Sequence, residues 1–488
     1  MFESSFSLLL FALFLNLSVP LFIGIPFLWL IFWNKFRGIL LYVLAFFIGT
    51  GVISYSLFNI QFIHIWIGYA EYFSLLWLII FGIFVRLWRK DFHMIDCLHS
   101  LRISWDMKDI LSSFTHLSLG KKIFTFIGWF SVCAIWVLSF LFTAYFPSYS
   151  DDSFTNWHKP SINIYYDDGI KIFWPEEEIL WRGRLWYPLF IPLYKALIAD
   201  MFGVWNDIYA NIWHYLSFFF FIIGISTITW LQSKNIFYTL LPSITIVGLP
   251  LVFFHISEGY LDLACALYSV WTLYFLLLFL QKKDIDFLLM AILFWSILSH
   301  LKNDGIVIYL LGIILAFVFL LSLEKKWGEI FSLLKINWQK TIFACIIILW
   351  CVVPFIGIKS YYDFWYNQAA GEVTWVGISS KVHWEIFWVF PHIFFSQDNY
   401  NIALIFITWM VIIWLKKNMK ELRLIIFAWI FIFLLLLWVF LFTENYQWVM
   451  NQTTVNRVFT MLCVILFSFI GLFAHALHTQ KKSEYKNI

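Results

Sequence analysis

The sequence predicts an all-α, polytopic membrane protein, and three observations support this fold class. First, 62% of the 488 residues are hydrophobic and only 12% are charged, whereas soluble domains carry about 25% charged residues. Second, the apolar residues fall in runs that approach the length of about 20 residues needed to cross a bilayer. Third, basic residues gather in alternate loops between these runs, as expected when those loops face the cytoplasm.

About 13 apolar runs are candidates for transmembrane helices, each crossing the bilayer once. Two of them, 286–300 and 401–415, are short for a span, so each is a candidate for a tilted or re-entrant segment. The runs occupy residues 6–33, 39–58, 65–87, 122–146, 208–231, 236–254, 261–280, 286–300, 305–323, 341–358, 401–415, 424–442 and 457–478.

The charges predict the orientation of the chain. With the N-terminus outside, 23 of the 32 Lys and Arg residues fall on the inner side, whereas 19 of the 29 Asp and Glu residues fall outside. An excess of Lys and Arg in loops marks the cytoplasmic side. We therefore expect a multi-pass protein with its N-terminus outside and its C-terminus cytoplasmic.

The runs and loops divide the chain into three parts. Residues 1–121 form an N-terminal three-helix extension with a basic inner loop. Residues 122–358 form a transmembrane core with an acidic outer loop, 147–207, and residues 359–488 form a C-terminal part with the outer loop 359–400. Both outer loops are rich in aromatic residues, so we expect them to form short helices at the membrane interface.

Asp151 and Asp152 lie near the start of the acidic loop, a few residues after the run 122–146 ends. A carboxylate near the bilayer surface can accept a proton from a hydroxyl or bind a divalent cation. The pair can equally form a solvated turn that caps the following helix. A divalent metal at these two residues is left open, and no other cofactor is expected.

Other charged residues of this loop suit an anionic ligand. His158 and Lys159 follow the two aspartates closely. Arg182 and Arg184 lie outside, against the general charge distribution, so they could bind a phosphate or neutralise the neighbouring Glu176–Glu178.

Charged residues also stand where later apolar runs begin or end on the outer side. Glu258 and Asp262 are four residues apart, which puts them on one helix face at the start of a span. Lys302 and Asp304 separate two apolar runs, and Arg457 begins the last one. These cations could hold a lipid phosphate, or they could pair with a carboxylate or reach outward to water.

Four stretches resemble motifs of a known class of enzymes. They are Asp151-Asp152 with Trp157-His158-Lys159, then Tyr187-Pro188, then Glu258-Gly259-Tyr260-Leu261-Asp262, and then Leu301-Lys302-Asn303-Asp304-Gly305. In order and outer placement they resemble the GT-C class of integral membrane glycosyltransferases, especially bacterial relatives of the protein-O-mannosyltransferases and of the lipid A aminoarabinose transferases. The chain departs from that class in having Asp304 in place of Glu, and in an outer loop that follows the fourth run rather than the first.

The resemblance implies a donor of the polyprenyl phosphate-sugar type and a lipid, glycan or protein acceptor at the outer face of a bacterial inner membrane. Asp151 or Asp152 would act as the general base, and the sugar would invert its configuration. Membrane lipids are expected partners, and nucleic acid is not. The residues implied in binding the donor phosphate or other parts of the substrate are His158, Lys159, Arg182, Arg184, Tyr187, Glu258, Asp262, Lys302, Asp304 and Arg457.

Two other functions fit a multi-pass protein with large outer loops. A flippase or transporter of a lipid-linked sugar predicts ionisable residues in the middle of the membrane and a repeat in the two halves. The charged residues lie near the ends of the apolar runs, and no repeat is evident. A polysaccharide polymerase or ligase of a different membrane fold also has large outer loops, so only the order of the motifs argues against it.

Overall fold

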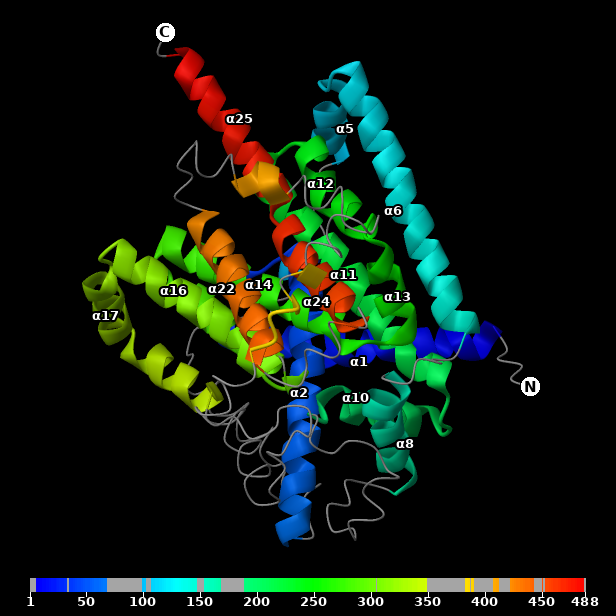
Figure 1. Ribbon diagram of the computed structural model, residues 1–488. Coiled ribbons are helices and arrows are strands. Elements are labelled where there is room, and N and C mark those ends of the chain that lie inside the picture. The colour runs from blue at the N-terminus through cyan, green and yellow to red at the C-terminus, as the bar shows by residue number, and fades with distance from the viewer. Residues whose placement is uncertain are drawn as a thin grey trace. The chain divides into compact units, whose positions relative to one another are not determined.

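The computed structural model describes residues 6–32, 35–67, 99–101, 107–146, 153–167, 188–303, 305–348, 382–386, 388–389, 407–411, 422–442, 450 and 453–486. Within these ranges the chain forms helices and turns and no β-strand (Figure 1), which confirms the predicted all-α class. The chain divides into two compact units. The first comprises 1–236 and 256–260, and the second comprises 237–255 and 261–488.

In the first unit, α1 (Phe6–Phe32) packs against α2 (Gly38–Ile67). Glycines allow the two backbones to approach closely, as is common between helices in membranes. A Cβ atom added at Gly24 would lie 1.9 Å from the carbonyl oxygen of Ala45, and one added at Gly49 would lie 1.9 Å from that of Pro20.

We expect Gly24→Ala to destabilise the protein by about 1–3 kcal/mol, the usual cost of inserting a group into a packed core. The added methyl group would meet backbone of α2, so the two helices would have to move apart. The measurement is the midpoint of thermal unfolding in detergent. Gly120→Ala is the matched control, because nothing lies within 4 Å of a Cβ atom there. An equal effect of both substitutions would contradict this account of the α1–α2 contact.

In the described part of the chain, the first unit contains six more helical elements. They are α5 (Met107–Thr115), α6 (Leu119–Tyr145), the π-helical turn η2 (Phe154–His158), α8 (Lys159–Tyr166), α10 (Phe190–Phe202) and α11 (Asp207–Ser233). α11 packs against α1, α2, α6 and α10. On α6 the side chains of Phe126, Trp129 and Phe130 are at least 60% exposed, as suits a helix that faces lipid.

The second unit is built around α14 (Leu261–Lys282), nearly all of whose side chains are buried. α14 forms an antiparallel hairpin with α15 (Ile285–Leu298), and it also packs against α24 (Thr453–Phe467). The unit also contains η3 (Gly305–Leu310), α16 (Leu311–Leu323), α17 (Trp327–Ile336), α22 (Arg423–Phe442) and α25 (Ile470–Lys486). Two further helices, α12 (Ile236–Val247) and α13 (Pro250–Glu258), precede α14 in the chain.

Seven described helices are long and apolar enough to cross a membrane, or up to nine if each of two bent helix pairs is one span. The bent pairs are Ile236–Val247 with Leu251–Glu258, at 72°, and Ile308–Leu323 with Trp327–Ile336, at 110°. The multi-pass prediction is therefore confirmed. The count of about 13 is not confirmed, because most of the runs 65–87 and 401–415 lies outside the described residues. The run 286–300 forms a helix too short to count as a span.

Candidate functional site

Six of the predicted site residues lie in the described part of the chain. They are His158, Lys159, Glu258, Asp262, Lys302 and Arg457. The other six lie outside it, and their predicted roles stay predictions. They are Asp151, Asp152, Arg182, Arg184, Tyr187 and Asp304.

In the second unit, Asp262 and Lys302 form a buried ion pair. The Nζ atom of Lys302 donates to Oδ1 of Asp262 at 2.7 Å. Asp262 lies in the first turn of α14, and Lys302 follows the end of α15. These ends meet because α14 and α15 are joined by a short turn, in which the Asp284 side chain accepts a hydrogen bond from the backbone N–H of Asp286.

Two more ionisable side chains complete this ion-pair cluster of Asp262, Lys302, His255 and Arg457. Both His255 and Arg457 lie close enough to Asp262 to interact with its carboxylate electrostatically. Arg457 reaches it from α24, which packs against α14. Two permanent cations, Lys302 and Arg457, therefore interact with the Asp262 carboxylate. Such an arrangement suits a bound phosphate, with which both cations could form charge-assisted hydrogen bonds.

In the first unit, Lys195 of α10 is completely buried among polar side chains. Its Nζ atom donates to Oδ1 of Asn211 at 2.9 Å and lies 3.5 Å from Nε2 of His158. Nδ1 of His158 in turn lies 3.9 Å from Oδ1 of Asp207. With His214, these residues form what we call the lysine cluster.

The N-terminus of α11 holds the acidic member of the lysine cluster in place. Asn206 caps the helix by accepting hydrogen bonds from the backbone N–H groups of Ile208 and Tyr209. Nε1 of Trp205 donates to Oδ1 of Asp207 at 2.7 Å. The capping sequence therefore fixes the carboxylate beside His158.

Burial sets the protonation of the lysine cluster. It lowers the pKa of Lys195 to about 7, although the nearby Asp207 carboxylate acts in the opposite direction. Burial, together with the charge of Lys195, also lowers the pKa of His158 well below its usual value. At neutral pH, therefore, His158 is uncharged and Lys195 is close to the midpoint of its titration.

We expect the stability of the protein to rise with pH between about 7 and 10.5 because of Lys195. In the unfolded chain Lys195 has the ordinary lysine pKa of 10.5, so it keeps its proton over this pH range. In the folded protein it has released that proton. Below pH 7 both states are protonated, so the cost of burying the ammonium group is fully present.

The measurement is the thermal unfolding midpoint at several pH values from 6 to about 10. Lys195→Met should make the midpoint higher at pH 6 and flatten its rise with pH. Lys159→Met is the control, because Lys159 is only half-buried and should leave the rise intact. A wild-type midpoint that stays constant or falls over this range would contradict a neutral Lys195.

The turn Glu258-Gly259 contacts the lysine cluster. Gly259 has φ +72°, and a Cβ atom there would lie 2.9 Å from Oδ1 of Asn211 and 3.2 Å from Nε2 of His214. Only glycine fits this backbone conformation in so little space. Nε2 of His214 is buried and has no hydrogen-bond partner among the described residues, which leaves it available to a ligand or a water molecule.

A hydrogen bond connects this turn to the acidic loop. The Ser153 hydroxyl donates to the backbone carbonyl oxygen of Glu258, and both residues are buried. Ser153 directly follows Asp152 in the chain. The backbone immediately after the aspartate pair is therefore anchored beside the segment that leads into α14.

Lys195, Asn211 and His214 were not predicted from the sequence. Lys195 is the single cation of a mainly apolar helix, and such a residue more often reaches toward water. A signal was nevertheless present, because Asp207, Asn211 and His214 recur at helical spacing on a mainly apolar run. The sequence alone did not show that this polar face meets Lys195.

Neither a metal site nor a disulfide is found in the described residues. No group of three or more His, Cys, Asp or Glu side chains among them could hold a metal ion. Asp151 and Asp152 lie outside the described part, so metal binding by them stays a hypothesis. None of the four described cysteines, Cys133, Cys265, Cys345 and Cys463, is in a disulfide.

Comparison of the chain with protein-family models, with curated proteins and with solved structures found no match. The functional conclusion therefore rests on the residues and contacts described above.

Proposed function

We propose that this protein is a membrane glycosyltransferase that moves a sugar from a polyprenyl phosphate-sugar donor to a lipid, glycan or protein acceptor. The observation that supports this most is the ion-pair cluster, where Lys302 and Arg457 both interact with the Asp262 carboxylate at the end of a membrane helix. Two cations at that depth suit a phosphate attached to a lipid. The same cations would stabilise the negative charge that develops on the phosphate as it leaves.

Asp151 or Asp152 is the proposed general base. The carboxylate takes the proton from an acceptor hydroxyl while the hydroxyl oxygen attacks the anomeric carbon. The bond from that carbon to the phosphate oxygen breaks, its electron pair leaves with the lipid phosphate, and the configuration inverts. The buried Ser153–Glu258 hydrogen bond supports this role, because it fixes the residue that directly follows the aspartate pair in the chain.

The test is turnover of a panel of short-chain prenyl phosphate sugars by the purified protein, followed by mass spectrometry. We expect one donor of the panel to lose its sugar and to yield the free prenyl phosphate. If no donor is consumed with water, simple alcohols or membrane extract as acceptors, the transferase proposal is rejected.

A second candidate function is transport of a lipid-linked sugar, favoured by the two bent helix pairs. Broken helices at membrane depth are a common feature of transporter binding sites. The assay is movement of a fluorescent lipid-linked sugar across liposomes that contain the protein. Translocation without consumption of any donor would favour the transporter over the transferase.

We also propose the finer topology, with about 13 spans, the N-terminus outside and the C-terminus in the cytoplasm of a bacterium. The supporting observation is the excess of Lys and Arg in the loops assigned to the inner side. A green fluorescent protein fused after Ile488 should therefore fluoresce, and an alkaline phosphatase fused there should be inactive. The opposite pair of results would reverse the orientation.

A further inference from the structure

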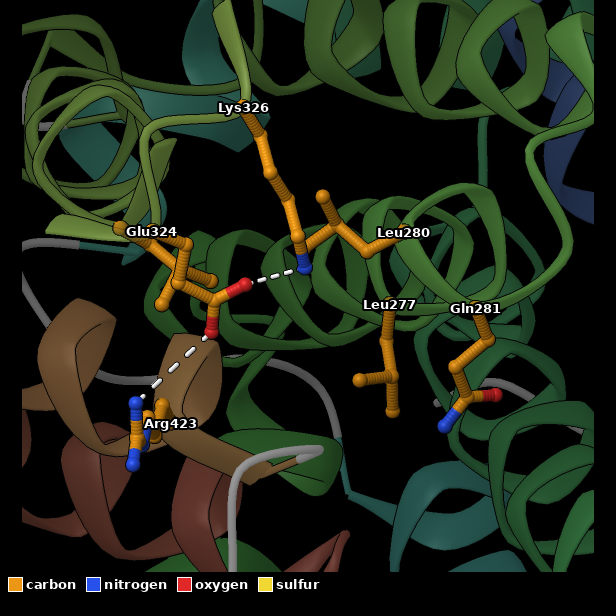
Figure 2. A pocket seen from close by; sticks show the side chains of 7 residues that line it. Leu277, Leu280, Gln281, Glu324, Lys326 and Arg423 are labelled. Atoms are coloured by element: carbon orange, nitrogen blue, oxygen red, sulfur yellow. Dashed lines mark hydrogen bonds and ion pairs between the residues drawn. The ribbon is translucent and has the colours of Figure 1, made fainter. Parts of the chain in front are cut away.

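Charged side chains gather at one end of the second unit, where α14 ends at Lys282, α16 ends at Leu323 and α22 begins at Arg423. Figure 2 shows Glu324 between Lys326 and Arg423, beside the last turn of α14. Lys326 donates to Glu324, and Nη1 of Arg423 lies 3.8 Å from Oε1 of the same side chain. Because charges are costly within the hydrocarbon of a bilayer, this charged layer marks the level of one membrane surface.

α17 lies within this charged layer. It runs at 110° to the apolar helix that precedes it (Figure 1). Two ion pairs connect this region to the turn between α14 and α15. Nζ of Lys283 donates to Oε2 of Glu329 on α17 at 3.1 Å, and Nζ of Lys340, just after α17, donates to Oδ1 of Asp286 at 2.6 Å. A helix so steeply inclined to a span, with its charges in this layer, lies along the membrane surface rather than across it.

Large apolar side chains project from α17 and from the residues that follow it. Phe331, Ile336 and Trp338 are each at least 58% exposed. Trp327 stacks on Phe331, with ring centroids 5.9 Å apart. Water is a costly environment for such side chains, whereas Trp and Phe are common where a helix contacts the headgroup region of a bilayer.

Two exposed cations accompany these apolar side chains. The ammonium groups of Lys325 and Lys335 have no ion-pair or hydrogen-bond partner among the described residues. Lys335 follows Phe331 by four residues, so the two side chains are neighbours on the exposed face of α17. Glu329 is the only carboxylate in α17, and it is already paired with Lys283. The charge of this face therefore complements anionic headgroups.

We propose that α17 lies on the membrane surface and binds anionic phospholipids there. Lys325 and Lys335 contact the lipid phosphates, while Phe331 and Ile336 insert among the upper parts of the acyl chains. Phosphatidylcholine would bind less tightly, because its choline group offsets the charge of its phosphate. The orientation proposed above puts α17 on the cytoplasmic side, where membranes carry most of their anionic lipid.

The test compares the full-length protein in nanodiscs of phosphatidylcholine with the same protein in nanodiscs of phosphatidylcholine mixed with phosphatidylglycerol. Backbone hydrogen exchange is followed by mass spectrometry. The amides of α17 exchange when the helix leaves the lipid surface, so their exchange rate reports how tightly the helix is held. We expect exchange in α17 to be at least about tenfold slower with phosphatidylglycerol, because two cations contribute.

The buried helix α14 is the internal reference for this comparison. Its amides should exchange at the same rate in both kinds of nanodisc. Both leaflets of a nanodisc have the same lipid composition, so the outcome depends neither on the orientation of the chain nor on sugar transfer.

Variants separate the role of the charges from that of the apolar side chains. Lys325→Gln and Lys335→Gln should each reduce the difference between the two lipids by about fivefold, the usual contribution of one cation at an anionic surface. Phe331→Ala should instead speed exchange in α17 by about tenfold in both lipids and leave their ratio unchanged. Lys234→Gln is the control with an expected change below about twofold, because Lys234 is an exposed lysine of the first unit, at the end of α11.

Equal exchange of α17 in the two lipids would overturn the proposal, as would a difference that survives both glutamine substitutions. Lys335→Arg keeps the charge and should keep the full difference. If Lys335→Arg loses the difference as Lys335→Gln does, the lysine acts on structure rather than through its charge, and the proposal is wrong. If inorganic phosphate added to phosphatidylcholine nanodiscs slows exchange as much as phosphatidylglycerol does, α17 binds a soluble anion instead of a lipid.

Discussion

Asp151→Asn or Asp152→Asn is expected to lower kcat for sugar transfer by about 10²–10⁴-fold, the usual contribution of a general base. The asparagine side chain is nearly isosteric with aspartate but cannot accept a proton from the acceptor hydroxyl. If only one of the two substitutions has this effect, that residue is the base. The measurement is the rate of prenyl phosphate release, with KM determined separately.

Asp167→Asn is the matched control for this experiment, because Asp167 lies in the same acidic loop, at the end of α8. It should retain nearly wild-type kcat. If Asp151→Asn and Asp152→Asn lower kcat equally, and a higher concentration of a divalent cation restores kcat, the two aspartates are metal ligands. Full activity in both variants would remove the aspartate pair from the mechanism.

Lys302→Met is expected to lower the free energy of unfolding by about 3 kcal/mol, because it leaves the Asp262 carboxylate buried without its 2.7 Å partner. Removal of one member of a buried pair usually costs about 3–5 kcal/mol. The lower end applies here because Arg457 still interacts with Asp262. The measurement is the shift in the denaturation midpoint in detergent.

A double-mutant cycle tests whether this loss comes from the pair. Asp262→Asn in the Lys302→Met background should recover much of the stability, because no uncompensated charge is then buried. The double variant should still fail to transfer sugar if Lys302 binds the donor phosphate. Additive losses in the double variant would mean that the two side chains contribute to stability independently.

The sequence predicted the charged residues of the ion-pair cluster but not which of them pair with one another. Asp262, Lys302 and Arg457 stood out in the sequence because each is a charge at the end of an apolar run. The sequence left open whether Lys302 binds a phosphate, pairs with Asp304 or reaches outward to water. The structure places it against Asp262, 40 residues away, because α14 and α15 form a hairpin.

The lysine cluster was not predictable in the same way. Lys195 and Asn211 lie on different helices, and His158 belongs to a third element, η2. Their contacts depend on how α10 packs against α8 and α11. The perturbed pKa of Lys195 is a consequence of that packing, since an exposed lysine with the same neighbours in sequence would titrate normally.

The sequence by itself determined the environment of this protein and its class of secondary structure. Composition and the length of apolar runs are properties of contiguous residues, and in a bilayer every backbone polar group of such a run must be satisfied within the helix. Only the tertiary structure decided which charges meet, in the Asp262–Lys302 pair, the lysine cluster and the Glu324–Arg423 pair. Those contacts join residues on separate elements, and their partners are set by helix packing rather than by any local pattern.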